Sequence, residues 1–307
     1  MKLFIQIPCF NEEDTIGVTL AALPRNVEGF DSVEILIIDD GSSDETVEVA
    51  KKFGINHFVH FYSNQGLARA FMAGIYYCIK NGADVIVNTD ADNQYNADDI
   101  SKLTSPILNS QVEFVIGSRP ISSIQHFSFS KKLLQRLGSW VVRKVSNTDI
   151  EDAPCGFRAI TSNAAKKLNV YNDYTYTLET IIQAGQKRIS MISVPIRTNE
   201  YLRPSRLMKS VWDYIKLSVF TIIRIFVIYK PFAFFMSIAL LLFITSFGLG
   251  LRFIYYYFIG DGAGHVQSVI LSAVLLSISF QTGLIAFIAD LQAFNRQMLE
   301  DIKINTY

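Results

Sequence analysis

The sequence predicts an α/β domain built on a mainly parallel sheet, followed by an interfacial helix and two membrane-spanning helices. Two observations support this architecture. Up to about Tyr201, apolar strand-like runs alternate with helix-like segments, as in soluble α/β proteins. From Val211 onward apolar residues dominate and charged residues become sparse, which is typical of a membrane segment.

The predicted strands of the first part are short apolar runs that end in polar or acidic clusters. The first run, Leu3–Ile7, stops at Pro8, and a helix over Glu12–Ala22 follows with Asn11 as its N-cap. Further strands are expected at Val33–Ile38, His57–Tyr62, Asp84–Asn88 and Glu113–Ile116, with helices reaching about Phe53 and covering Leu67–Lys80. In a parallel sheet of this kind, ligands bind outside the carboxyl ends of the strands.

The segment Ser205–Tyr229 predicts a helix that lies in the membrane interface. It is apolar except for polar residues spaced close to the helical period, namely Arg206, Lys209, Asp213, Lys216 and Arg224. An amphipathic helix packed on a core is the alternative. The basic and aromatic residues beside the next apolar run favour the interfacial position.

Two uncharged runs follow, Pro231–Leu251 and Val266–Ala289. A helix crosses a bilayer with about 20 apolar residues, so both runs are long enough, and the glycine-rich linker between them predicts a hairpin. Basic residues flank the hairpin, so the positive-inside rule places the α/β domain and both termini in the cytoplasm, with Arg252 as an exception. Two buried helices of a soluble protein are the alternative. The predicted boundaries are 1–203 for the α/β domain, 204–230 for the interfacial helix, 231–290 for the hairpin and 291–307 for a cytoplasmic tail.

Composition excludes some classes of function. The chain has 28 basic and 28 acidic residues, and this balance gives no support to nucleic-acid binding. The three cysteines are far apart, so neither a zinc site nor a disulfide framework is indicated.

The strongest chemical signal is the run from Asp90 to Gln94, directly after a predicted strand. Asp90 and Asp92 are separated by one residue and can both face an open crevice. Such hard oxygen ligands suit Mg²⁺ or Mn²⁺, and Gln94 can add a neutral oxygen. A solvated turn is the alternative, but the position at the end of a buried strand favours the metal site.

Two further polar clusters also follow predicted strands. Asp39 and Asp40 can accept hydrogen bonds from ribose hydroxyls or a base N–H, although the residues around them can also serve as a helix N-cap. In the run Pro8–Glu12, Phe10 can stack near a base and Glu12 can reach a ribose. By itself, that run is consistent with a turn and a cap.

Together these segments resemble glycosyltransferase family two, which has the GT-A fold. The family pattern P-x-Y-N-E, D-D-G-S-x-D, D-A-D-x-Q and G-S-R appears in order, as Pro8–Glu12, Asp39–Asp44, Asp90–Gln94 and Gly117–Arg119. The later run Cys155–Ala159 matches the family element S-G-F-R-A. With the interfacial helix and the hairpin included, the chain is similar over almost its whole length to the dolichyl- and polyprenyl-phosphate glycosyltransferases.

The resemblance implies inverting transfer of one hexose from a UDP- or GDP-sugar to a polyprenyl phosphate, undecaprenyl or dolichyl, at the cytoplasmic membrane face. It implies a Mg²⁺ or Mn²⁺ cofactor held by Asp90, Asp92 and Gln94. The residues expected to act in catalysis are Asp92, Arg119, Arg203 and Arg206. Those expected to bind the nucleotide-sugar are Pro8, Phe10, Glu12, Ile38, Asp39, Asp40, Asp90, Ala91, Asp92 and Arg119.

The chain departs from the family in its basic elements. Glu200 stands where the pattern R-x-x-G-x-S-K has its arginine, so Arg203 is expected to replace it, while Ser205 and Arg206 match the final pair. Relatives also carry an arginine and a serine four residues apart that hold the acceptor phosphate. The residues expected to hold that phosphate here are Lys131, Gln135, Ser205 and Arg206.

Three other functions are alternatives. A processive polysaccharide synthase would need a Q-x-x-R-W motif and more membrane spans. A non-catalytic GT-A binding protein would not need the intact Asp90 and Asp92 pair. A transferase acting on a lipid hydroxyl would not need a basic acceptor site. A homo-oligomer is also possible, because Ser246, Gly248 and Gly250 offer small helix-packing surfaces.

Overall fold

The computed structural model describes residues 1–120, 129–170, 176–199, 219–220, 223–224 and 226–304, without the side chains of 129–137 and 300–304. The chain divides into two compact units, Met1–Ser218 and Val219–Tyr307. The predicted interfacial helix lies largely in 205–218, outside the described residues.

The first unit is built on a seven-stranded sheet in the order β3-β2-β1-β4-β6-β5-β7. All neighbouring strands are parallel except β6, which runs antiparallel to both β4 and β5. The predicted mainly parallel sheet is therefore confirmed. The strands are β1 (Lys2–Cys9), β2 (Ser32–Asp39), β3 (His57–His60), β4 (Val85–Asn88), β5 (Phe114–Ser118), β6 (Arg158–Thr161) and β7 (Met191–Pro195).

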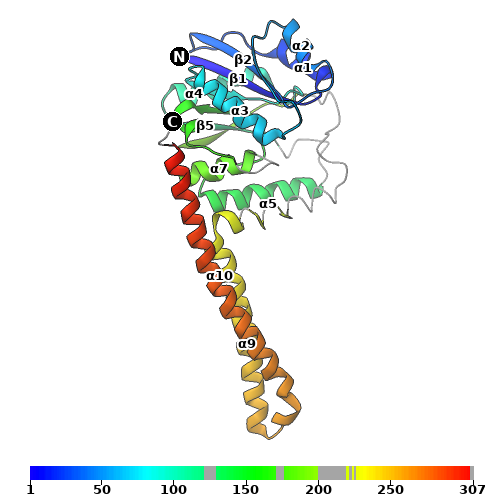
Figure 1. Cartoon of the computed structure of the whole chain (residues 1–307), viewed down its shortest axis with the longest axis vertical. Helices are drawn as coiled ribbons and strands as arrows, with labels where there is room; N and C mark the ends of the chain where they lie inside the picture. The colour runs from blue at the N-terminus through cyan, green and yellow to red at the C-terminus, as the bar shows by residue number, and fades with distance from the viewer. Residues whose placement is uncertain (121–128, 171–175, 200–218, 221–222, 225, 305–307) are drawn as a thin grey trace. The chain divides into compact units, whose positions relative to one another are not determined.

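Helices connect these strands (Figure 1). The helix predicted at Leu67–Lys80 has those same bounds. The first helix begins one residue later than predicted. Asn11 is not its N-cap, because it adopts a left-handed φ of 54° and Glu12 occupies the cap position. The helices are α1 (Glu13–Ala22), α2 (Thr46–Lys52), α3 (Leu67–Lys80), α4 (Ile100–Leu108), α5 (Phe129–Ser146), α6 (Ser162–Lys166) and α7 (Thr177–Gln186), with a 3₁₀ turn over Ala97–Asp99 before α4.

The reversed direction of β6 determines what meets the carboxyl end of β4. In the register of the two strands, Arg158 at the start of β6 pairs with Asn88 at the end of β4. The residues before Arg158 therefore lie at the sheet edge where the chain leaves β4. Strand β6 was not predicted from the sequence, and neither was β7.

The second unit is a helical hairpin of α9 (Pro231–Ile259), a 3₁₀ turn (Gly262–His265) and α10 (Val266–Ile304). The two long helices lie side by side (Figure 1). Both are long and apolar enough to cross a membrane. The most apolar 18-residue window of each helix has a mean hydropathy of 2.3 in the first and 2.0 in the second. Only 11% of each apolar window is buried within the structure, which argues against the core helices of a soluble protein. Helix α10 continues past the predicted end of the second span into the predicted tail.

Candidate active site

The loops after β1 and β2 are joined by backbone-to-side-chain hydrogen bonds. Asn11 N donates to Ser42 Oγ at 2.9 Å, and Ser43 N donates to Asn11 Oδ1 at 2.8 Å. Glu12 N donates to Thr46 Oγ1 at 2.7 Å. The left-handed turn at Asn11 makes this pairing possible. The two predicted nucleoside-binding loops thus form one surface at the carboxyl edge of the sheet.

Asp39 holds its own loop in place. Its side chain is 1% exposed. Oδ1 accepts a hydrogen bond from Ser42 N at 3.0 Å, and Oδ2 lies 2.5 Å from His60 Nδ1. Both oxygens are therefore engaged within the protein.

Asp40 connects the β2 loop to the start of α3. Its carboxylate accepts hydrogen bonds from Gln65 N at 2.7 Å and Gly66 N at 2.9 Å. Burial raises the pKa of Asp40, and the two N–H donors partly oppose this rise. The next residue, Gly41, has a φ of 76°, and a Cβ there would lie 2.7 Å from the backbone carbon of Ser63. Only glycine allows these two loops to approach so closely.

The other predicted nucleoside-binding residues differ in exposure. Pro8 and Ile38 are register partners inside β1 and β2, and both are buried. Phe10, by contrast, leaves 41% of its surface exposed at the end of β1. Glu12 is 9% exposed and accepts a hydrogen bond from Thr15 Oγ1 at 2.8 Å. Phe10 is therefore the one of these four with a large exposed face.

The loop after β4 carries the predicted metal ligands. Asp90 and Asp92 are each half-buried, while Ala91 between them is buried. Ala91 O accepts a hydrogen bond from Thr19 Oγ1 at 2.8 Å, which ties the loop to α1. Asp92 Oδ1 accepts one from Gln94 N at 3.1 Å. This turn leaves the two carboxylates on one short loop at the sheet edge.

Gly156 lies directly against Asp90. A Cβ at Gly156 would be 3.0 Å from Asp90 Oδ1 and 3.0 Å from Tyr176 Oη. Gly156 is held on both sides, since its N–H donates to Tyr95 Oη at 3.0 Å and its carbonyl accepts from Asn88 Nδ2 at 2.9 Å. A residue without a side chain thus leaves room around the Asp90 carboxylate. The sequence marked Gly156 only as part of a family element and assigned it no role.

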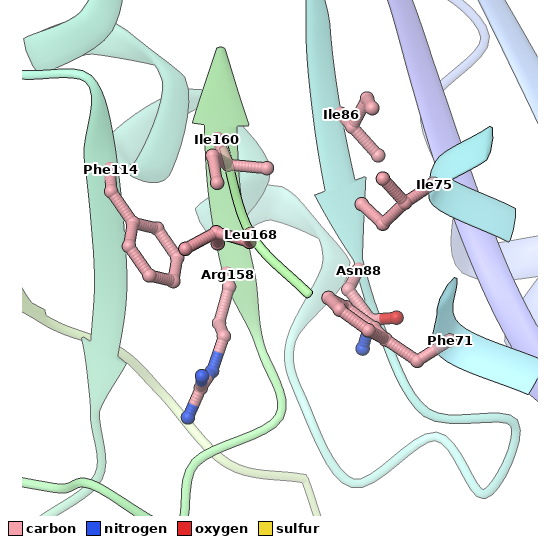
Figure 2. Close-up of a pocket in the computed structure, with 8 residues that line it drawn as sticks. All are labelled: Phe71, Ile75, Ile86, Asn88, Phe114, Arg158, Ile160 and Leu168. Atoms are coloured by element: carbon pink, nitrogen blue, oxygen red, sulfur yellow. The ribbon is translucent and has the colours of Figure 1, made fainter. Parts of the chain in front are cut away.

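Arg158 fixes the backbone that leads to Gly156. Its guanidinium is 2% exposed and donates to the carbonyls of Ala153, Cys155 and Thr177 at 2.6–2.8 Å. Burial lowers its pKa from the usual value. Arg158 lines a small cavity of about 10 Å³, which is room for about one water molecule and far too small for a sugar; Figure 2 shows the residues that line it.

The electrostatics of the loop favour a bound cation. Burial and, second to it, the neighbouring Asp92 charge together raise the pKa of Asp90 to about 7, although the hydrogen bond from Tyr95 and the charge of Arg119 oppose the rise. A divalent ion would relieve this repulsion. Among the described residues, no group of three or more acidic, histidine or cysteine side chains could hold a metal. Two carboxylates suit an ion whose other positions are filled by substrate oxygens and water. The role of Gln94 stays a prediction.

Arg119 is engaged with an acidic partner. Its Nε donates to Asp152 Oδ2 at 2.6 Å and its Nη2 to Asp152 Oδ1 at 3.0 Å. Both side chains are nearly buried, at 9% and 0% exposed. The sequence did not identify this partner. The predicted contact between Arg119 and a phosphate stays a prediction.

The chain after β7 returns to the loop after β4, which carries the predicted metal ligands. Thr198 forms an antiparallel bridge with Tyr95, and Asn199 N donates to Gln94 O at 2.9 Å. Upstream, Arg197 is held by the buried carboxylate of Asp99 at 2.8 Å. Residues about 100 positions apart in the chain therefore line the same loop.

Several predicted residues lie outside what the structure describes. Arg203, Ser205 and Arg206 are in the segment 200–218. The backbone of Lys131 and Gln135 belongs to α5, but their side chains are outside the described set. Their predicted roles at the acceptor phosphate stay predictions.

Comparisons with known proteins agree on the family. The model of glycosyl transferase family 2 matches residues 4–168. The UDP-N-acetylglucosamine–dolichyl-phosphate N-acetylglucosaminyltransferase of Methanococcus voltae is 28% identical, over 64% of this chain and 85% of the relative. The polyprenol monophosphomannose synthase of Mycolicibacterium smegmatis is 24% identical, over 65% of this chain and 78% of the relative.

The fold is also found in a solved structure. Glucosyl-3-phosphoglycerate synthase from Mycobacterium tuberculosis, crystallised with Mn²⁺, uridine diphosphate and glucosyl-3-phosphoglycerate, superposes with a TM-score of 0.55 at 18% identity. The match covers 73% of this chain and 78% of that one. The predicted GT-A fold is therefore confirmed. Sequence, fold and family model agree that the chain belongs to glycosyl transferase family 2.

Proposed function

We propose that this glycosyltransferase moves one hexose, with inversion, from a UDP- or GDP-sugar to a polyprenyl phosphate at the cytoplasmic face of a membrane. The observation that carries the proposal is the Asp90 and Asp92 pair at the carboxyl edge of a GT-A sheet, in a chain with two helices that could span a membrane. The relatives that transfer sugars to dolichyl phosphate or to a polyprenol support the acceptor.

The residues present fit a Mg²⁺ or Mn²⁺ ion. Asp90 and Asp92 supply hard oxygen ligands, and Gly156 leaves space beside them. When bound, the ion would neutralise charge on the donor diphosphate. The Mn²⁺ and uridine diphosphate in the glucosyl-3-phosphoglycerate synthase complex are consistent with this choice.

The joined loops after β1 and β2 are assigned to the nucleoside. The exposed ring of Phe10 offers a flat surface for a base. Asp39, Asp40 and Glu12 line the adjacent loops, although their carboxylates also hold those loops together. Their contribution is therefore both to shape the nucleoside site and to offer hydrogen-bond acceptors within it.

A phosphate acceptor does not require a strong general base. A hydroxyl must lose its proton as it attacks, whereas a phosphate monoester has a second pKa of about 6 and is largely a dianion at neutral pH. The enzyme needs cations that bring two anionic reactants together. Arg119 already binds Asp152, so we assign the acceptor phosphate chiefly to Arg203 and Arg206, with Ser205, Lys131 and Gln135 as further contacts.

The position of Asn199 is consistent with this assignment. Asn199 is hydrogen-bonded to the metal-binding loop, and Arg203 follows it by four residues. A chain covers at most about 3.6 Å per residue, so four residues span at most about 14 Å.

The proposed activity can be tested with a panel of nucleotide-sugars incubated with undecaprenyl or dolichyl phosphate, with the product detected by its lipid mass. We expect transfer that EDTA abolishes and that Asp92→Ala eliminates without unfolding the domain. Asp98→Ala is the matched control, because the Asp98 side chain is 79% exposed nearby and should leave turnover unchanged. Activity that survives both EDTA and Asp92→Ala would contradict the metal site. Equal transfer to polyprenol would favour the lipid-hydroxyl alternative.

Replacing arginine by lysine distinguishes a catalytic role of these residues from simple attraction to the membrane. Arginine binds phosphate bidentately, whereas any cation can attract anionic headgroups. We expect Arg203→Lys or Arg206→Lys to lower kcat while the protein stays membrane-bound. Wild-type turnover in both variants would leave only an anchoring role.

We also propose that the Gly260–His265 turn lies across the membrane from both termini. Asp261→Cys and Asn305→Cys should then react differently with an impermeant thiol reagent in sealed cells, while the native cysteines are buried. Equal labelling of the two sites would contradict this topology.

A further inference from the structure

Helix α10 exposes one amide side chain in the middle of its apolar run. Gln281 is exposed, and no charged residue occurs from Val266 to Ala289. It lies nine residues before Asp290, which is about 14 Å along the helix. In a hydrocarbon core about 30 Å thick, that is close to the centre.

Seven serine and threonine hydroxyls of the hairpin donate hydrogen bonds to backbone carbonyls within it, whereas the Gln281 amide has no such partner among the described residues. Ser246 and Ser272 donate to each other's backbone carbonyls across the two helices, at 2.7 and 2.8 Å. For Gln281 the structure gives no hydrogen bond to any described residue. The hydroxyls that donate to carbonyls within the hairpin are those of Ser237, Thr245, Ser246, Ser272, Ser277, Ser279 and Thr282.

An amide carries two donors and an acceptor, and in hydrocarbon no water can satisfy them. Polar side chains at this depth are costly unless they meet a polar partner. Gln281 is too far from the headgroups to reach water easily, and acyl or isoprenoid chains offer no hydrogen-bonding groups. A polar group of another polypeptide at the same depth would satisfy the Gln281 amide.

The geometry of α10 places Gln281 away from the contact that α10 makes with Ala239 of α9. Ser279 donates to Ala239 O on α9, and Ala286 is fully buried. At 100° per residue, Ser279 and Ala286 share one face of α10, whereas Gln281 lies two residues from Ser279 and therefore on the opposite face. Gln281 and Phe243 of α9 both line a hollow on this side of the hairpin, and a second hairpin would pack there.

The small-residue surface expected from the sequence is largely occupied within the hairpin itself. Ser246 is 1% exposed, and a Cβ at Gly250 would lie 3.2 Å from Ser272 Oγ. These residues pack α9 on α10. A contact between copies that uses them would have to open the hairpin, so the outer face of α10 is the better candidate.

We propose that Gln281 is a contact between two copies of this chain, in which its amide pairs with the same amide of the second copy. Copies in one membrane have the same orientation, so a given residue lies at the same depth in each. A two-fold axis along the membrane normal then brings the two Gln281 residues together. Two amides are self-complementary, since each can donate an N–H to the carbonyl of the other. The proposal rests on the membrane placement given under the proposed function.

Cysteine cross-linking in native membranes tests this contact. Ser277 is exposed one helical turn before Gln281, and the three native cysteines are buried. Oxidation of the Ser277→Cys full-length protein should give a disulfide-linked dimer. Adding Gln281→Leu should reduce that dimer at least about fivefold, and Gln281→Asn should retain it, because asparagine keeps the amide.

Leu241→Cys is the matched control. Leu241 is 66% exposed, close in depth to the hydrogen bond between Ala239 and Ser279 but on the far side of α9. The Leu241→Cys protein should remain monomeric on oxidation. Undiminished cross-linking in the Gln281→Leu protein would overturn the proposal, as would equal cross-linking at Leu241→Cys. Transferase activity and retention after alkaline carbonate washing are measured on the same membranes. Release of the protein by carbonate would refute the membrane placement, whereas retention with unchanged cross-linking would refute only the Gln281 contact.

Discussion

Replacing Gly156 by alanine adds one methyl group directly against Asp90. The new Cβ would lie 3.0 Å from Asp90 Oδ1, 3.1 Å from Asp90 Oδ2 and 3.0 Å from Tyr176 Oη, all tighter than ordinary carbon contacts. Gly156 cannot retreat easily, because Tyr95 and Asn88 bond its N–H and carbonyl. The Asp90 carboxylate is therefore expected to shift by a few tenths of an ångström.

The expected loss of activity follows from the sensitivity of catalytic rates to the positions of active-site groups. A misplacement of about 1 Å can cost about 100-fold in rate, so a shift of a few tenths should cost about five- to tenfold. This corresponds to about 1–1.4 kcal/mol of transition-state stabilisation. The assay measures kcat/KM for the nucleotide-sugar and the Mn²⁺ concentration that gives half-maximal activity. We expect kcat/KM to fall and the Mn²⁺ concentration for half-maximal activity to rise.

Gly138→Ala provides the matched control. Gly138 lies within α5, and a Cβ there would meet nothing within 4 Å. Turnover should be unchanged, and stability should rise by about 0.5–1 kcal/mol because alanine is the better helix former. A Gly156→Ala enzyme with wild-type kcat/KM and wild-type Mn²⁺ dependence would refute the argued role of the space beside Asp90.

Two stability predictions follow from the loops around the site. Gly41→Ala should cost about 3 kcal/mol or more, since it combines a φ of 76° with a backbone clash, whereas Gly54→Ala, with a φ of 73° and open space, should cost only about 1 kcal/mol. Equal melting temperatures of the two variants would contradict this. Burial by itself would raise the pKa of Asp99, but hydrogen bonds from Arg197 and Lys102 outweigh it and lower the pKa. The Asp99 carboxylate therefore stabilises the fold above its ordinary pKa of 3.8, and this contribution is lost as the pH falls below that value. The difference in stability between wild type and Asp99→Asn should shrink from pH 7 to pH 3.5, and a constant difference would count against the ion pair.

Local sequence patterns were sufficient to predict the helices and strands that have a strong hydrophobic periodicity or a clear boundary. The helix at Leu67–Lys80 and the two apolar helices follow from periodicity and length. Strands β6 and β7 were missed, because β6 has only four residues and both lie in a region without clear alternation. The N-cap at Asn11 was wrong because Asn11 bonds to the neighbouring loop instead.

The sequence by itself determined the family, the fold class, the order of the motifs and the two acidic residues that follow a buried strand. These depend on residues close together in the chain. Only the tertiary structure decided that Gly156 lies against Asp90, that Arg119 is paired with Asp152, and that the chain after β7 returns to the loop after β4. The physical reason is that each of these contacts joins residues at least 33 positions apart. The antiparallel insertion of β6 brings the first two pairs together, and the pairing of β7 with β5 returns the later chain, and no local preference of the chain encodes these strand pairings.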